Sequence, residues 1–174
     1  AESREIFLTY AQPYQGGART ALAVARLSDD AGELEDLRVI FAMSQASGSG
    51  RHFGSRVVEA PDGTLFLTVG DRGVVRERAQ DIEDHAGSVL RLTESGGAPK
   101  DNPFAGDETG LDEIFSFGNR NIQGLVVTAQ GQIWASEHAA RGGDELNLIE
   151  AGKNYGWPKA SRSKEYSGND AIGK

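Results

Sequence analysis

The feature that most restricts the fold of this 174-residue chain is the spread of its 23 glycines. They separate short runs of alternating apolar and polar residues and are not gathered into a linker. This pattern is typical of many short β-strands joined by tight turns, and no long segment has the periodicity of an amphipathic helix. We therefore expect an all-β protein, with one possible helical turn at residues 80–85. The expected strands are residues 5–10, 20–27, 38–43, 55–59, 64–69, 88–92, 124–128, 132–136 and 145–149.

Part of the sequence is repeated. When Gly63 is aligned with Gly131, apolar pairs, a turn and an aromatic residue fall in register over residues 56–68 and 124–136. Each copy is followed by a polar, glycine-containing loop and then by a further strand. Repeated four-stranded units of this kind predict a β-propeller, in which the equivalent loops of successive blades meet at one end of a central channel.

The composition restricts the partners. Asp and Glu number 26 against 18 for Lys and Arg, which gives a net charge of −8, and no basic run occurs. Nucleic acid and anionic membrane surfaces are therefore not expected partners. No apolar stretch approaches the length of a membrane span. The absence of cysteine excludes disulfides, zinc–thiolate sites and thiol nucleophiles.

One strand-turn-strand unit has a histidine and an aspartate at its ends. His52 precedes its first strand, Pro61-Asp-Gly63 forms the turn, and Asp71 follows its second strand. If the strands pair as a hairpin, both residues lie at the same end of the sheet, where a general base could meet its orienting carboxylate. A surface or core histidine without a catalytic role is the alternative that the residues alone leave open. The nearby glycines do not indicate a dinucleotide fold, because a strand and not a helix follows them.

Several other residues have ordinary interpretations when taken alone. Arg120 reads as a loop or salt-bridge arginine, and Glu145 as a solvated charge after a turn. No two histidines have the spacing of metal ligands, so a zinc or non-haem iron site is not expected. Trp134 and Trp157 read as core or blade-packing residues.

A family resemblance emerges from motifs that occur in one order along almost the whole chain. They are His52-Phe-Gly-Ser-Arg, Gly70-Asp-Arg-Gly, Gln80-Asp with His85-Ala-Gly, Asp101-Asn-Pro-Phe, Ser116-Phe-Gly-Asn-Arg-Asn-Ile-Gln-Gly-Leu, Arg141-Gly-Gly-Asp-Glu-Leu-Asn and Gly152-Lys-Asn-Tyr-Gly-Trp-Pro. Together they resemble the soluble aldose sugar dehydrogenases that depend on pyrroloquinoline quinone (PQQ).

The resemblance implies a six-bladed β-propeller of four-stranded antiparallel blades, of which this chain would be roughly half. Residues 1–174 would then form a single partial domain of about three blades, with 161–174 as a polar tail leading to missing blades. The missing blades would supply further cofactor contacts and part of the sugar pocket. Open blade edges would favour self-association of the isolated chain.

The resemblance also implies an activity, namely PQQ- and calcium-dependent oxidation of the C1 hydroxyl of aldoses to lactones. Hydride would pass to the quinone and electrons to an external acceptor, in the bacterial periplasm or outside the cell. His52 would be the general base and Asp71 would accept its other ring N–H. Arg120 would stabilise the quinone oxygen that gains negative charge, and Asn121 would add a hydrogen bond to the cofactor.

The same resemblance implies two calcium sites. The main-chain carbonyls of Ala139 and Ala140, which replace the family's usual glycine-proline pair, would bind the Ca²⁺ that bridges to PQQ. Glu145 and the carbonyl of Tyr155 would bind a second, structural Ca²⁺.

Two other functions are compatible with a propeller. One is a non-catalytic module that binds a carbohydrate or a protein partner. The other is a calcium-dependent lactonase, whose chemistry needs a carboxylate cluster around the metal.

Overall fold

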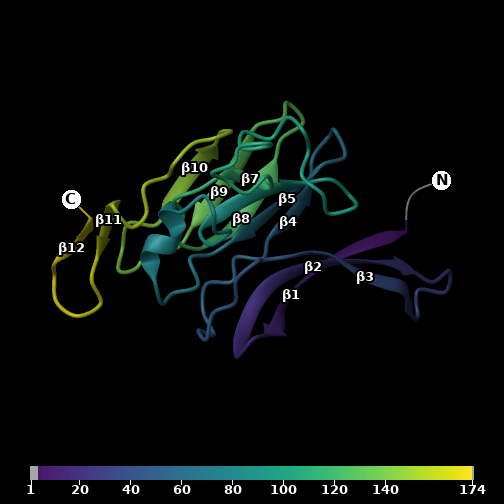
Figure 1. Ribbon diagram of the computed structural model, residues 1–174, viewed down its shortest axis with the longest axis horizontal. Coiled ribbons are helices and arrows are strands. Elements are labelled where there is room, and N and C mark those ends of the chain that lie inside the picture. The colour runs from purple at the N-terminus through teal and green to yellow at the C-terminus, as the bar shows by residue number, and fades with distance from the viewer. Residues whose placement is uncertain (1–3, 174) are drawn as a thin grey trace.

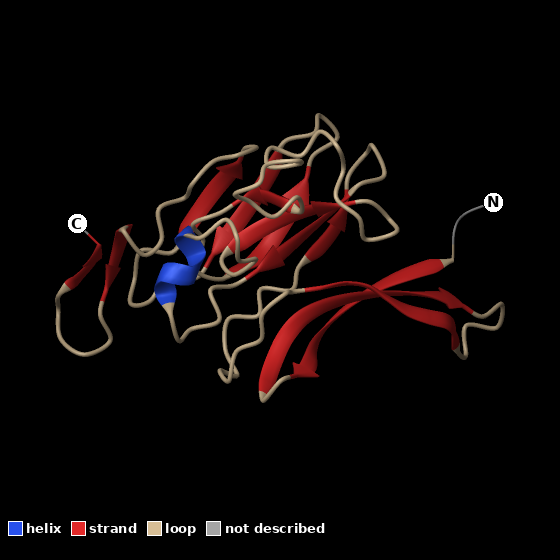
Figure 2. Ribbon diagram, viewed as in Figure 1, coloured by secondary structure: helices blue, strands red, loops and turns tan. Residues whose placement is uncertain are grey.

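The computed structural model describes residues 4–173, which form twelve strands, one short 3₁₀ helix and the loops between them (Figures 1 and 2). The elements are β1 (Glu5–Tyr14), β2 (Gly17–Leu27), β3 (Leu34–Ala42), β4 (Val57–Glu59), β5 (Leu65–Val69), η1 (Arg76–Gln80), β6 (Ser88–Leu92), β7 (Ile114–Ser116), β8 (Ile122–Val127), β9 (Ile133–Glu137), β10 (Glu145–Ile149), β11 (Ala160–Lys164) and β12 (Ala171–Gly173).

The strands form four antiparallel sheets in the orders β1-β2-β3, β4-β5-β6-β7, β10-β9-β8 and β11-β12. Each sheet uses strands that are consecutive in the sequence, so the chain completes one sheet before it starts the next, as the blades of a β-propeller do. In Figure 1 the β1–β3 sheet runs beneath the β4–β7 and β8–β10 sheets, and the β11–β12 hairpin lies at the opposite end from the N-terminus. The expectation of an all-β fold is confirmed.

All the expected strands are present, although most of their ends differ by a few residues. Three further strands, β7, β11 and β12, were not predicted because they are short or polar. The helical turn expected at residues 80–85 is wrong, since the 3₁₀ helix ends at Gln80. Beyond it the carboxylate of Asp81 accepts the N–H of Glu83 and that of Asp84 accepts the N–H of Ala86, and such local side-chain bonds compete with helix formation.

The internal repeat is present as two equivalent hairpins. Val58 pairs with Phe66 in the first, and Val126 pairs with Trp134 at the aligned position of the second. Gly63 and its counterpart Gly131 have φ angles of 80° and 79°, in the left-handed region that glycine tolerates best. The strand-turn-strand pattern in the sequence therefore predicted the actual register.

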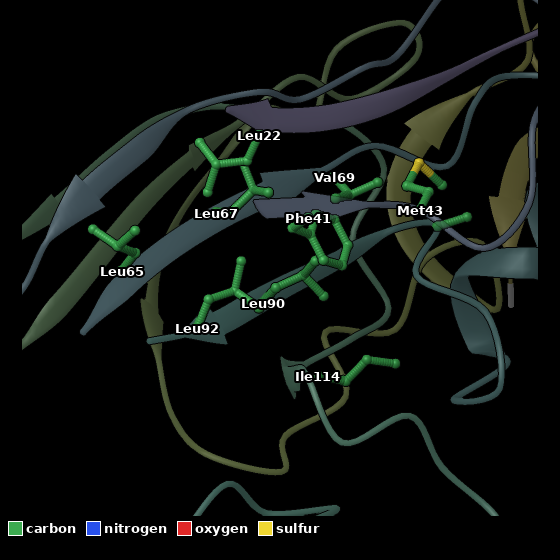
Figure 3. Close-up of a cluster of buried hydrophobic side chains, with 10 residues drawn as sticks. Leu22, Phe41, Met43, Leu65, Leu67, Val69, Leu90, Leu92 and Ile114 are labelled. Atoms are coloured by element: carbon green, nitrogen blue, oxygen red, sulfur yellow. The ribbon is translucent and has the colours of Figure 1, made fainter. Parts of the chain in front are cut away.

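The central β4–β7 sheet is covered on both faces. Alternate residues of β5 point to opposite sides, so Leu65, Leu67 and Val69 pack toward β1–β3, as Figure 3 shows for their cluster. Phe66 packs on the other side, among buried residues of β8 and β9, with an edge-to-face contact to Phe115 at a centroid distance of 5.0 Å. A strand buried on both faces is a rigid support for the loops at its ends.

Residues 161–174, expected as a polar tail, include most of the β11–β12 hairpin, up to Gly173. This hairpin is docked onto the rest of the structure. Ile172 packs with Trp157 and Ala79, and Arg76 of η1 makes a bidentate ion pair with Glu165 at 2.6 and 2.8 Å. That the segment leads to further blades stays a prediction. No helix within residues 4–173 has the length and hydrophobicity needed to cross a membrane.

Candidate functional site

His52 and Asp71 meet at one end of the β4–β5 hairpin, as the sequence predicts. Asp71 lies two residues beyond the end of β5, and its carboxylate is almost wholly buried, with 1% of the side chain exposed. The Nδ1 atom of His52 lies 2.6 Å from Oδ1 of Asp71. Since an ionised carboxylate can only accept, this bond places the ring proton on Nδ1 and leaves Nε2 as the atom that can accept a proton.

Further bonds fix the orientation of the Asp71 carboxylate. Oδ1 also accepts the backbone N–H of Gly73 at 2.8 Å, and Oδ2 accepts the indole N–H of Trp157 at 2.8 Å. The packing role expected for Trp157 is therefore only part of its contribution. The hydrogen bond to Asp71 could have been anticipated in general form, because a buried indole N–H needs an acceptor.

Arg120 lies beside this pair, in the segment between β7 and β8, and is 6% exposed. Its backbone carbonyl accepts the N–H of Asp71 at 2.8 Å, and its guanidinium lies 5.4 Å from the centroid of the Trp157 ring. Nη1 donates to the carbonyls of His138 and Ala139 at 2.9 and 2.7 Å. Nη2 donates to the hydroxyl of Tyr166 at 3.1 Å. Within residues 4–173 its guanidinium makes no ion pair with a carboxylate, which distinguishes it from an ordinary salt-bridge arginine.

Asn121 joins the two loops of the site. Its Oδ1 accepts the N–H of Gly54 at 3.2 Å and the side-chain amide of Gln123 at 3.1 Å, while its backbone carbonyl accepts the N–H of His138 at 3.1 Å. The Nδ2 group takes part in none of these bonds.

The loop of Ala139 and Ala140 is held through its main chain. Ala139 donates its N–H to Oδ1 of Asp144 at 2.9 Å, and Ala140 donates to Oγ of Ser163 at 3.1 Å. In the part of the chain that the structure describes, no three His, Cys, Asp or Glu side chains gather to hold a metal ion. A cation at this loop would therefore depend on carbonyl oxygens, which calcium accepts.

Glu137 is a buried carboxyl group that the sequence analysis missed. It accepts the backbone N–H of Arg120 with one oxygen and Nδ2 of Asn119, at 2.8 Å, with the other. Burial raises the pKa of the Glu137 carboxyl to about 7, although its hydrogen bonds act in the opposite direction. A signal was present in the repeat, where Glu137 aligns with Val69, a fully buried core position.

The structure also brings Glu145 and Tyr155 together. Both line a small crevice whose walls include Glu137 and Arg120. The phenol of Tyr155 donates to the carbonyl of Leu148 at 2.5 Å, and its backbone N–H donates to the carbonyl of Phe117 at 2.9 Å. Its main-chain carbonyl takes part in neither bond. The neighbouring histidines lie outside this arrangement: His85 is buried and accepts the N–H of Ser44, and His138 is exposed, with Nδ1 3.8 Å from Oδ2 of Asp144.

Comparison with known proteins shows to which protein family the chain belongs. The glucose/sorbosone dehydrogenase family matches residues 1–174, and the chain belongs to this family. Among individual relatives, the chain is 41% identical to the aldose sugar dehydrogenase YliI of Escherichia coli over 97% of its own length and 46% of that protein's. The chain spans less than half the length of this protein and of other curated relatives that it matches.

Solved structures agree with the fold. The apo form of the soluble aldose sugar dehydrogenase of Escherichia coli superposes with a TM-score of 0.93 at 40% identity, over 99% of this chain and 51% of that one. The PQQ-bound aldose sugar dehydrogenase of Streptomyces coelicolor superposes with a TM-score of 0.75 at 26% identity, over 98% and 48%. The chain therefore has the fold of about half a β-propeller of this family.

Proposed function

We propose that this chain is part of a PQQ-dependent aldose dehydrogenase that oxidises the C1 hydroxyl of aldoses to lactones. The observation that carries the proposal is the bonded His52–Asp71 pair beside Arg120, a buried cation that makes no ion pair within residues 4–173. The aldose sugar dehydrogenase relatives and the PQQ-bound structural neighbour support it.

Each of these residues has a role that follows from its contacts. His52 accepts the hydroxyl proton at Nε2, since Nδ1 is held by Asp71. Asp71, whose two oxygens are fixed by Gly73 and Trp157, stabilises the imidazolium that forms. A bound PQQ would supply the acceptor for the hydride that leaves C1. Arg120 offers a permanent positive charge for the negative charge that develops near it.

The residues present fit an anionic quinone. Nη2 of Arg120 donates to the neutral hydroxyl of Tyr166, an acceptor that an anionic oxygen can replace. Asn121 has an amide group to donate. We propose that the carbonyls of Ala139 and Ala140 bind one Ca²⁺ beside the cofactor, and that Glu145 and the carbonyl of Tyr155 bind a second. All of these are hard oxygen donors, as calcium prefers.

The full-length parent protein tests this proposal. Loaded with PQQ and calcium, it should reduce a dye acceptor in proportion to the lactone formed from an aldose. Chelation should abolish the activity and calcium should restore it. An absence of PQQ-dependent dye reduction with a panel of aldoses would contradict the dehydrogenase, and normal turnover after complete chelation would contradict the calcium-bridged site. Cell fractionation tests the periplasmic or secreted location that we propose with it.

We further propose that the isolated chain self-associates. The β8–β10 sheet exposes Val126, Leu146 and Leu148 by 53%, 70% and 39%, and strand β10 is an edge with unpaired backbone groups. Sedimentation analysis of the 174-residue chain should show concentration-dependent oligomers, and a strictly monomeric chain would contradict this.

A further inference from the structure

The backbone of His52 is held in an unusual conformation. Its φ angle is 55°, in the left-handed region, and Ser55 follows with a φ of 72°. Residues with a Cβ atom adopt this region infrequently, and they keep it only where their surroundings impose it. Something must therefore hold residues 49–55 in place for His52 to reach Asp71.

Arg72 supplies that restraint on both sides of His52. Its side chain is fully buried, with 0% exposure. Nη1 donates to the carbonyl of Arg51 and Nη2 donates to the carbonyl of Ser49 at 3.0 Å. The guanidinium also stacks on Phe53, 3.4 Å from the centroid of its ring. The residues immediately before and after His52 thus contact the same guanidinium.

No ion pair in the described part of the chain explains why a buried position is occupied by arginine. Within residues 4–173 Arg72 makes no ion pair, and its Nε atom has no hydrogen-bond partner. Burial lowers the pKa of its guanidinium to about 10, so the group is still a cation near neutral pH. An apolar chain of similar length would fill the space without the cost of burying a charge. What distinguishes arginine here is the planar fork that reaches two carbonyls at once.

The neighbours of Arg72 act on the same loop. A Cβ atom at Gly70 would collide with the carbonyl oxygen of His52, and one at Gly73 would lie 3.3 Å from its Nδ1. Residues 70–73 therefore contact the ring and the main chain of His52 together.

We propose that Arg72 is a positioning residue for the general base. It holds the main chain of residues 49–53 so that the imidazole of His52 meets Asp71 and presents Nε2 to the substrate. This inference rests on the proposed function of the same site.

The positioning role is tested by steady-state kinetics of the full-length, PQQ-loaded parent and its variants Arg72→Lys and Arg72→Met. We expect kcat to fall about tenfold in the lysine variant and about 100-fold in the methionine variant, while the KM for the sugar and the affinity for PQQ change less than about twofold. The matched control is Arg91→Lys, because Arg91 is paired with Asp62 and Asp101 at the other end of the hairpin. In a His52→Ala background, Arg72→Met should cause no further loss of kcat, because its effect passes through His52. An equal loss in both backgrounds, or unchanged kcat in both Arg72 variants, would overturn the proposal.

Histidine ring NMR gives a readout that does not need activity. In the parent labelled with ¹⁵N-histidine, His52 is assigned by the signals that His52→Ala removes. Arg72→Met should broaden or double the His52 ring signals and leave those of His85 unchanged. Arg72→Lys should have the same effect to a smaller degree, and it replaces the methionine variant in this measurement if that variant does not fold. Unchanged His52 signals in a folded variant would contradict the positioning role. If no form of the parent oxidises sugars, the proposed function fails while this measurement still decides the role of Arg72.

Discussion

The two copies of the internal repeat use one scaffold for two kinds of contact. The alignment that places Gly63 over Gly131 also places His52 over Arg120 and Asp71 over Ala139. In each copy the residue ahead of the first strand bonds the residue beyond the second. His52 bonds the carboxylate of Asp71 at 2.6 Å, and Arg120 bonds the main-chain carbonyl of Ala139 at 2.7 Å. The same hairpin therefore presents a histidine in one copy and an arginine in the other.

The loops that complete these contacts are held differently. Asp71 is fixed by bonds to its own side-chain oxygens, and it is buried together with the next residue, Arg72. The loop that carries Ala139, between β9 and β10, is more exposed, and Arg120, Asp144 and Ser163 hold its main-chain groups. The first copy should therefore depend on side-chain identity and the second on backbone conformation.

The largest expected effect is on His52, the base that we propose in the first copy. In the full-length parent, His52→Ala should lower kcat for aldose oxidation by about two to four orders of magnitude, because it removes the Nε2 atom that we propose takes the hydroxyl proton. The affinity for PQQ should be nearly unchanged. Steady-state kinetics with a dye acceptor and a cofactor titration measure both quantities. Near-normal turnover would show that His52 is not the base and that the first copy does not depend on its side chain.

The second copy predicts a dependence of stability on pH. Val69 and Glu137 occupy equivalent positions, and burial raises the pKa of the Glu137 carboxyl from 4.5 to about 7. The folded state keeps a proton that the unfolded state releases at lower pH. The contribution to stability is thus complete below about pH 4.5 and is lost as the pH rises to about 7. A shift of this size corresponds to roughly 3 kcal/mol of unfolding free energy.

Urea unfolding of the metal-free protein at pH 5 and pH 8 measures this change. Glu137→Gln should remove it, because the amide is neutral throughout and still accepts the N–H of Arg120. Glu59→Gln, at the exposed end of β4, is the matched control. An equal pH dependence in wild type and Glu137→Gln would show that the buried carboxyl does not carry it.

The sequence predicted the parts of this site that local pairing controls. The turn at Gly63 and the alternation of residues 56–69 determine the hairpin, and a hairpin brings His52 and Asp71 to one end without further information. The register of the second copy followed from the same pattern. The strands β5 and β9 were predicted for the same reason.

What could not be predicted depends on contacts between distant segments. Trp157 reaches Asp71 across 86 positions of sequence, and Tyr166 reaches Arg120 across 46. Neither contact follows from periodicity, which reports only on neighbours in a strand or helix. Strands β11 and β12 were missed for a related reason, because they are short and their hairpin is held by contacts with the distant residues Trp157 and Arg76.

Trp157 allows the link between the copies to be tested. Trp157→Phe keeps an aromatic ring beside Arg120 but removes the N–H that Oδ2 of Asp71 accepts. We expect kcat of the parent to fall about tenfold with little change in KM, since one hydrogen bond to a charged group contributes about 1.5–3 kcal/mol and part of it is recovered by relaxation. Trp134→Phe, on the half-buried face of β9, is the matched control and should have near-normal kcat. Equal losses in both variants would mean that the indole serves packing alone.

The smallest expected effect concerns Ala139, the counterpart of Asp71. Its contacts use the backbone N–H and carbonyl, so Ala139→Ser should change kcat of the calcium-loaded parent by less than about twofold, whereas Asp71→Ala should lower it by about 100-fold or more. Both variants are compared by steady-state kinetics, with thermal unfolding to confirm that each is folded. If Ala139→Ser lowered turnover as much as Asp71→Ala, the second copy would depend on its side chain as the first does, and the division between a side-chain contact and a backbone contact would be wrong.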